Sequence, residues 1–169
     1  LSLTRKAADA GNAWAKKVLP QVEQQTIDRK KPADAAEKFA MVRSAAESGD
    51  LDAQRKLANY FIEGFGVAQD INAAIEWYKK AADAGDAIAM TQLGVLYDKG
   101  RGVPVDYTEA IRWYKPAAEK EEAQAQYNYG VLMYHGIGVE RDLEQGREWI
   151  RRAANNGSQT AIRALQTLK

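Results

Sequence analysis

Short stretches of the chain carry apolar side chains every three or four residues, which is the spacing of one face of an α-helix. One arrangement of apolar, small and polar positions returns about every 36 residues and opens on an alanine pair, at Ala7, Ala45, Ala81, Ala117 and Ala153. A repeat of this length predicts a solenoid, because each unit is too small to bury its own apolar face and is completed by its neighbours.

The spacing of these pairs makes residues 1–169 one array. We expect a degenerate unit over about 7–44, three clear units over 45–80, 81–116 and 117–152, and partial units at both ends. Because the chain starts and stops inside a unit, we expect it to be an excised part of a longer protein. The apolar faces predicted for 1–10 and 161–168 are then suited to end-to-end self-association, since a solenoid without polar caps exposes a core face.

Polar residues and glycines mark the ends of two helices, A and B, in each unit. A side chain able to accept from free backbone N–H groups precedes helix A, at Asn12, Asp50, Asp86 and Ser158. Helix A ends at a Gly-x-Gly-Val sequence whose first glycine suits a left-handed residue, at Gly64, Gly100 and Gly136. Helix B follows a capping aspartate, at Asp70, Asp106 and Asp142. A phosphate-binding interpretation of the glycines is not favoured, because no strand precedes them.

Two places depart from this pattern. Pro20 occupies a helix-interior position in the first unit, which also has 26–29 where the others have Gly-x-Gly. We therefore expect the first unit to be distorted, since such a proline removes a backbone hydrogen bond. Pro116 falls in the last turns of a helix B, Glu121 replaces the turn glycine, and Glu122 replaces the capping aspartate. We expect a changed angle between units, or a soft spot, near 115–122.

The clearest unit contains a long series of small, apolar and aromatic residues at fixed positions, namely Ala87, Ala89, Leu93, Gly94, Tyr97, Gly100, Gly102, Val103, Asp106, Ala110, Trp113, Ala117 and Ala118. This pattern closely resembles the SEL-like repeat (SLR), a relative of the tetratricopeptide repeat, over 45–152. The resemblance implies an all-α fold, a right-handed α/α superhelical solenoid of antiparallel helix pairs with the A helices on the concave side. It also implies an adaptor or scaffold, of a kind found in bacterial periplasmic, secreted and signalling proteins and in eukaryotic protein quality control.

Composition narrows the possible functions. The 24 basic and 23 acidic residues are scattered, with a net charge of +1, so binding to a nucleic-acid backbone is disfavoured. The chain has no cysteine and therefore no disulfide, no thiolate nucleophile and no cysteine-based metal site. No apolar run approaches 18 residues, so we expect no membrane insertion. The compartment is left open, with a periplasmic or secreted location implied by the family resemblance.

The sequence contains few candidate catalytic residues. The single histidine, His135, has no evident partner and is interpreted as a surface or packing residue. None of the serines has a lysine three residues on, and no His, Asp and Glu grouping has metal-ligand spacing. The tryptophans of helix B, Trp77, Trp113 and Trp149, are interpreted as packing residues. We expect a protein without enzymatic activity, cofactor or metal.

Binding is the remaining hypothesis, and the face of helix A that is not used for the core is the candidate site. Its predicted residues are Asp52, Arg55, Asn59, Ile62, Ile88, Thr91, Val95, Asp98, Gln124, Tyr127, Val131 and Tyr134. The apolar and aromatic members favour a protein or peptide partner, held as an extended or helical segment in the concave groove. A solvated inner face that also packs neighbouring A helices is the plain alternative. Two other functions stay open: a glycan or cell-wall binder using Tyr107, Tyr127 and Tyr134, and a spacer within a larger protein.

Overall fold

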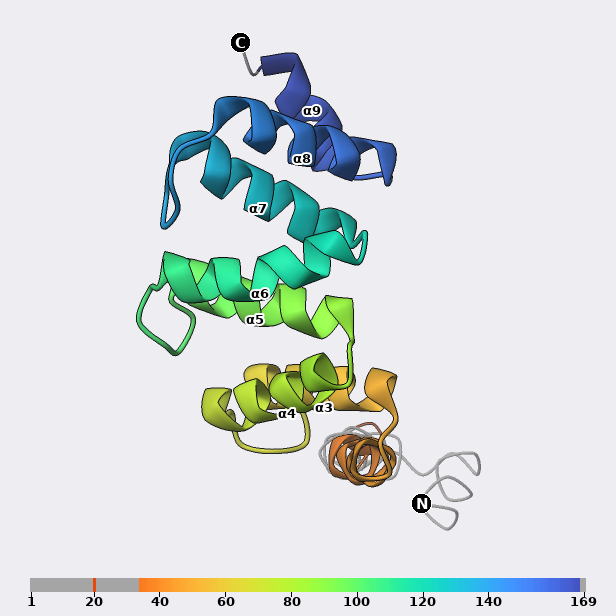
Figure 1. The fold of residues 1–169 in the computed structure, drawn as a ribbon. Helices are drawn as coiled ribbons and strands as arrows, with labels where there is room; N and C mark the ends of the chain where they lie inside the picture. Colours follow the sequence, from red (N-terminus) through yellow and green to blue (C-terminus); the bar gives the residue numbers. More distant parts are fainter. Residues whose placement is uncertain (1–19, 21–33, 168–169) are drawn as a thin grey trace.

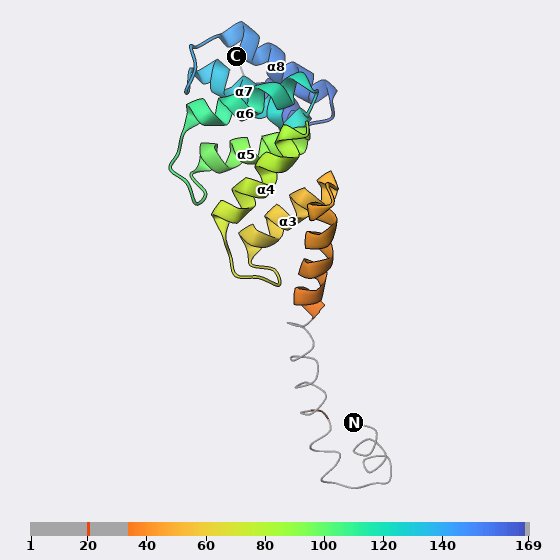
Figure 2. The same ribbon diagram turned by 60° about the horizontal axis from the view of Figure 1, so that its bottom comes forward.

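The computed structural model describes residue 20 and residues 34–167, which form helices joined by turns and contain no strand. The helices stack as antiparallel pairs along one axis, from 34–47 at one end to α9 at the other (Figures 1 and 2). The predicted all-α solenoid is confirmed. The expectations for Asn12, for 26–29, for the distorted first unit and for the end face at 1–10 lie outside the described residues.

Helices α3 to α8 all have the same length, 13 residues, and α9 is shorter. After the helical segment 34–47 come α3 (Leu51–Glu63), α4 (Ile71–Asp83), α5 (Ala87–Lys99), α6 (Tyr107–Glu119), α7 (Ala123–His135), α8 (Leu143–Asn155) and α9 (Gln159–Thr167). The A helices are α3, α5 and α7, and the B helices are α4, α6 and α8. The helix α9 stands in the A position of a further unit and packs on α8.

The predicted helix ends are confirmed. Asp86 caps α5 by accepting from the Ala89 backbone N–H at 2.8 Å, and the other predicted caps from Asp50 to Asp142 act in the same way. The Ser158 hydroxyl accepts from the Ala161 N–H at 3.3 Å. The first glycine of each Gly-x-Gly adopts the left-handed conformation, which a Cβ would disfavour. Each A helix can therefore end sharply and its chain can turn back into helix B.

The core runs between the helix pairs rather than inside separate globules. Tyr78, Tyr114, Leu57, Leu93 and Ile150 are its largest fully buried apolar side chains. The three helix-B tryptophans are half-buried and pack against this core, which supports the structural interpretation of Trp77, Trp113 and Trp149. The helices α7 and α8 approach closely because glycines face each other there: a Cβ at Gly146 would lie 2.8 Å from the Gly130 carbonyl oxygen.

The segment 115–122 keeps regular hydrogen bonding despite its unusual residues. Helix α6 runs through Pro116, and Glu122 caps α7 by accepting from the Ala125 N–H at 2.6 Å. The irregular feature is Glu121, which has a φ of 64° where the equivalent residues are glycines. A left-handed conformation costs a residue with a Cβ about 1–2 kcal/mol. Local strain is thus present at this turn, while the changed angle between units stays a prediction.

No helix within the described residues is long and apolar enough to cross a membrane.

Candidate functional site

Two of the predicted inner-face residues join neighbouring A helices. Arg55 on α3 lies with its Nε 3.1 Å from Oδ2 of Asp86, the cap of α5, and it also pairs with Asp52. Thr91 on α5 lies with its hydroxyl 2.7 Å from Oε2 of Glu122, the cap of α7. Thr91 is only 2% exposed. The expectation that Thr91 contacts a partner is therefore corrected, because its side chain is enclosed between repeats.

Three further predicted residues also have structural contacts. The Asn59 side-chain oxygen accepts a 2.6 Å hydrogen bond from the Tyr78 hydroxyl. Ile62 and Val95 are half-buried and pack against the central core. These contacts match the plain alternative of an inner face that partly packs the array, and they leave less of the face open to a partner.

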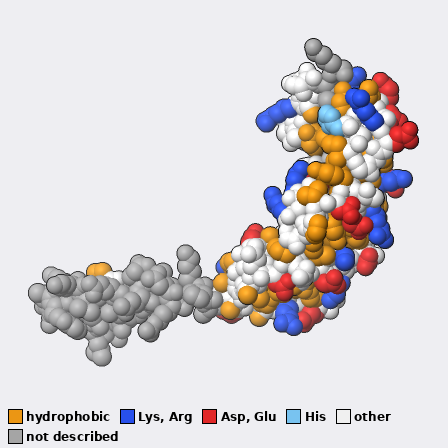
Figure 3. Space-filling model, turned by 90° about the vertical axis from the view of Figure 1, so that its left-hand side faces the viewer, with side chains coloured by type: hydrophobic (Ala, Val, Ile, Leu, Met, Phe, Trp, Pro, Cys, Tyr) orange, Lys and Arg blue, Asp and Glu red, His pale blue; other side chains and the backbone are white. Residues whose placement is uncertain are grey.

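The structure brings other predicted residues together in one apolar crevice between the last two clear units. We call it the Tyr127 crevice; it has a volume of about 300 Å³ and is lined by Asp98, Lys99, Tyr107, Tyr127, Asn128, Val131, Leu132 and Ile137. Its walls come from the end of α5, the start of α6, the middle of α7 and the turn that follows α7. Figure 3 shows apolar side chains gathered on this side of the molecule, along the stack below the single histidine.

Asp98 is the acidic residue of the Tyr127 crevice and is held in place by its neighbours. Its Oδ2 lies 2.9 Å from the Lys99 ammonium and accepts from the Tyr114 hydroxyl at 3.4 Å. Burial raises the pKa of Tyr114 well above its ordinary value, and the Asp98 charge raises it further. The Tyr114 ring can pack against α5 because Gly94 has no side chain: a Cβ there would be 2.4 Å from the ring. Gly94 thus permits the contact that fixes Asp98.

The aromatic and aliphatic walls differ in their exposure. Tyr127 and Val131 also pack toward the small core between α8 and α9, so each of them also contributes to the packing of the array. Tyr107 is 39% exposed. Ile137 is the variable residue of a Gly-x-Gly turn and was not predicted as a site residue. The sequence did contain one signal for it: this turn position carries an aliphatic side chain, whereas the equivalent position one unit earlier is Arg101.

The remaining predicted residues lie beside the Tyr127 crevice or away from it. Gln124 donates to the Asn128 side chain at 2.8 Å and so contacts its lining. The Tyr134 ring packs edge-on against His135, with centroids 5.2 Å apart. Ile88 is 46% exposed and does not line the crevice. The structure therefore places Asp98, Tyr127 and Val131 together and distributes the other residues along the array.

The described part of the chain contains no group of three His, Asp or Glu side chains arranged to hold a metal ion. The chemistry available at the Tyr127 crevice is apolar contact, aromatic stacking and hydrogen bonding to the Asp98 carboxylate, the Asn128 amide and the Lys99 ammonium.

Solved structures similar to this chain include relatives above 30% identity. A Sel1 repeat protein from Oxalobacter formigenes is 37% identical, with a TM-score of 0.70, and the match covers 77% of this chain and 98% of that one. A protective antigen of uropathogenic Escherichia coli strains, displaying an SLR fold, is 33% identical with a TM-score of 0.68. That match covers 85% of this chain and 34% of the antigen, so the chain spans about a third of its length.

A more distant structure shares the fold. The cysteine rich protein B of Helicobacter pylori is 19% identical, with a TM-score of 0.63 over 79% of this chain and 96% of that one. No curated protein sequence matches the chain significantly.

The family model of the Sel1 repeat matches residues 51–86, 87–121 and 123–158. Each match starts six residues after the start of one of the predicted units 45–80, 81–116 and 117–152, so the family model divides the same stretch in a different frame, and the unit boundaries stay a prediction. Proteins of this kind are generally interaction scaffolds and are typically non-enzymatic. On its sequence match and its helical architecture, the chain belongs to the Sel1 repeat family.

Proposed function

We propose that this chain is a protein-interaction scaffold that binds an extended or helical segment of a partner along its A helices, with the Tyr127 crevice as the main contact. The observation that carries the proposal is the crevice itself. It is the place where predicted inner-face residues from α5 and α7 converge around an apolar volume of about 300 Å³. A volume of this size accommodates one aliphatic or aromatic side chain of a partner.

The energetics favour an anchor of this kind. Burying a leucine- or phenylalanine-sized side chain contributes roughly 1.5–3 kcal/mol, and tyrosines at the centre of an interface are frequent hot spots. Asp98 is already oriented by Tyr114 and Lys99, so it can accept from a partner donor without losing much side-chain freedom. Apolar contact would supply affinity, and the carboxylate would orient the bound segment.

The test uses a peptide selected against the purified protein from a displayed random library. Tyr107→Ala removes an exposed wall of the crevice and should weaken binding of that peptide by about tenfold, measured by fluorescence anisotropy. Leu143→Ala is the matched control. Leu143 holds the same repeat position one unit later, is 42% exposed and lies outside the Tyr127 crevice. It should leave the dissociation constant within about twofold of wild type.

Tyr127→Ala is a poorer variant, because Tyr127 also packs against the α8–α9 core and its loss would lower stability. Equal weakening by Tyr107→Ala and Leu143→Ala, or no effect of either, would contradict the proposed crevice. A saturable response to oligosaccharides that depends on Tyr107 would instead favour the glycan-binding alternative.

A further inference from the structure

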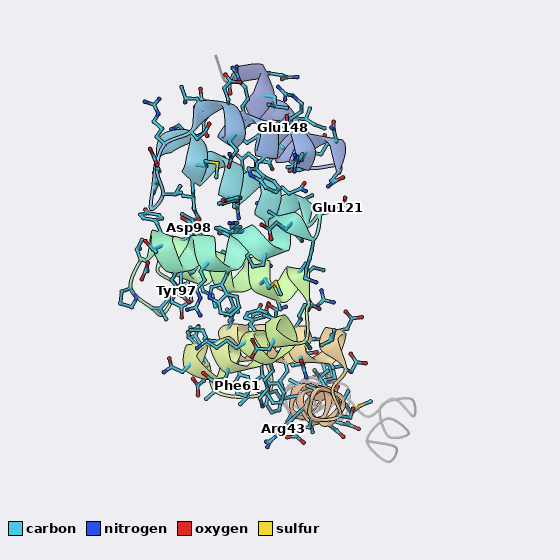
Figure 4. All side chains as sticks on the ribbon, in the orientation of Figure 1. Arg43, Phe61, Tyr97, Asp98, Glu121 and Glu148 are labelled. Carbon is cyan, nitrogen blue, oxygen red and sulfur yellow. The ribbon has the colours of Figure 1, made fainter. Side chains whose placement is uncertain are left out.

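A second cavity lies at the opposite end of the same repeat layer. Its volume is about 440 Å³, and its lining includes Glu119, Glu121, Trp149, Arg152 and Asn156. Figure 4 shows Asp98, of the Tyr127 crevice, on one side of the stack and Glu121 on the other. The two sites therefore use different ends of the helices and different side chains. We call this second site the Glu121 cavity.

The preceding repeat shows what fills the equivalent place there. Thirty-six residues earlier, Glu119, Glu121 and Asn156 correspond to Asp83, Gly85 and Lys120. The Lys120 ammonium lies over Gly85: a Cβ at Gly85 would be 3.7 Å from Nζ. In that repeat, the chain's own lysine therefore occupies the space beside the turn glycine.

In the last clear repeat, the equivalent lysine is missing, and two carboxylates stand where the preceding repeat has one. Asn156 is too short to fill the space, and its amide donates to the Gln126 side-chain oxygen at 3.0 Å and to the Glu121 carbonyl at 3.3 Å. Within the described residues, no hydrogen bond or ion pair is formed by the carboxylates of Glu119 and Glu121.

The nearby arginine is committed elsewhere. Arg152 packs its guanidinium over the Trp149 ring, 4.8 Å from the centroid, and its Nε donates to Glu148 at 3.3 Å. The hydrogen bonds from Arg152 and then Arg151 hold the pKa of Glu148 below its usual range, as expected of a paired carboxylate. Arg152 therefore neutralises Glu148 rather than Glu119 or Glu121.

We propose that the Glu121 cavity binds a lysine side chain of a protein partner, in the place that Lys120 fills in the preceding repeat. The carboxylates of Glu119 and Glu121 would pair with the ammonium, and the edge of Trp149 would contact the methylene groups. Charge complementarity and the occupied equivalent one repeat earlier both point to this occupant. The proposal concerns a surface separate from the Tyr127 crevice, so either site can fail without the other.

The test follows ¹⁵N-labelled protein by NMR during titration with the blocked peptide acetyl-Gly-Lys-Gly-amide, against the same peptide with norleucine in place of lysine. We expect saturable shifts, in the millimolar range, of the Trp149 indole and of amides near 119–122 and 155–156 with the lysine peptide alone. Binding should weaken at high salt, because the pair is ionic.

Two variants and one control make the result specific. Asn156→Lys restores the in-chain lysine and should weaken binding at least about tenfold, as should the Glu119→Gln/Glu121→Gln double variant. Asn156→Lys is expected to fold, because Lys120 has the same helix-capping backbone conformation, with φ of −86° against −84°. Asp83→Asn, the matched control in the preceding repeat, should leave binding unchanged.

Three results would each overturn the inference. These are equal shifts with the norleucine peptide, wild-type binding by both the Asn156→Lys and the double glutamine variants, and the absence of saturable shifts with the lysine peptide.

Discussion

Arg55 and Asp86 join successive A helices through a contact of 3.1 Å between Nε and Oδ2, and Thr91 and Glu122 make the equivalent contact one repeat later at 2.7 Å. In the first pair a long side chain, Arg55, contacts a short acidic one, Asp86. In the second pair a short side chain, Thr91, contacts a longer acidic one, Glu122. In both, the acid also caps the following helix. The change in length of one side chain is compensated by the change in the other, so in both repeats one acidic residue caps a helix and also links two A helices.

The Thr91–Glu122 contact should contribute measurable coupling. Thr91→Val removes the hydroxyl and Glu122→Ala removes the acceptor, and the two changes should be coupled by about 1 kcal/mol in a double-mutant cycle. The measurement is the free energy of unfolding by urea for the four proteins. Additive effects of the two substitutions would show that the contact does not stabilise the array.

Glu121 should destabilise the turn that it occupies. Glu121→Gly should raise the free energy of unfolding by about 1 kcal/mol, because the left-handed φ of 64° is free of steric cost only for glycine. Glu121→Ala keeps the Cβ and should give no such gain in the same denaturation experiment. A gain of equal size with alanine would assign the effect to charge rather than backbone strain.

Gln54 offers a second route to stabilisation. Its side-chain nitrogen donates to the Ala46 carbonyl at 3.2 Å, but its Oε1 has no hydrogen-bond partner among the described residues. The equivalent Gln126 has Asn156 as donor, whereas the corresponding residue near Gln54 is Ala84. Ala84→Asn should therefore stabilise the protein by about 1 kcal/mol.

The control for this gain uses the side chain found in the intervening repeat, which is Met90. In a Gln54→Met background, Ala84→Asn has no acceptor to satisfy, and thermal unfolding should show no increase in Tm. An increase that persists there would mean that the introduced amide acts through another contact.

Stability should also fall at high pH because of the buried tyrosines. Burial, and then the charge of Glu63, raises the pKa of Tyr78 from 10.0 to about 12. A pKa raised on folding stabilises the native state while the group is protonated, so this contribution is complete below pH 10 and is lost as pH rises through 12.

Denaturation between pH 9 and 12 should therefore show a decline in the free energy of unfolding, of which Tyr78 accounts for about 2 kcal/mol. Tyr78→Phe should flatten the decline, whereas Tyr107→Phe, which removes an exposed hydroxyl, should not. The same slope in Tyr78→Phe and wild type would contradict this assignment.

The repeat pattern was sufficient to predict the fold because its signals are local. Each cap, each left-handed glycine and each apolar stripe depends on residues within one turn of a helix, and Asp50, Gly64 and Asp70 behave as the sequence indicates. At the start of α7 the capping aspartate is replaced by Glu122, and the glutamate side chain still accepts the capping hydrogen bond.

The site was less predictable because it depends on contacts between units. The helical spacing placed Thr91 on the inner face, but only the structure shows that the next cap, Glu122, encloses it. The same limit applies to Ile137, whose role in the Tyr127 crevice requires α6 and α7 to come together. The position of a residue on a helix predicts which way its side chain points, but the packing of the neighbouring repeats determines whether that side chain stays exposed.

The most direct measurement of the central claim is NMR mapping of the library-selected peptide on the ¹⁵N-labelled protein. If the Tyr127 crevice is the partner site, the perturbed amides will cluster at Asp98, Tyr107, Tyr127, Val131 and Ile137. Saturable shifts confined to other surfaces, with these amides unmoved, would contradict the account.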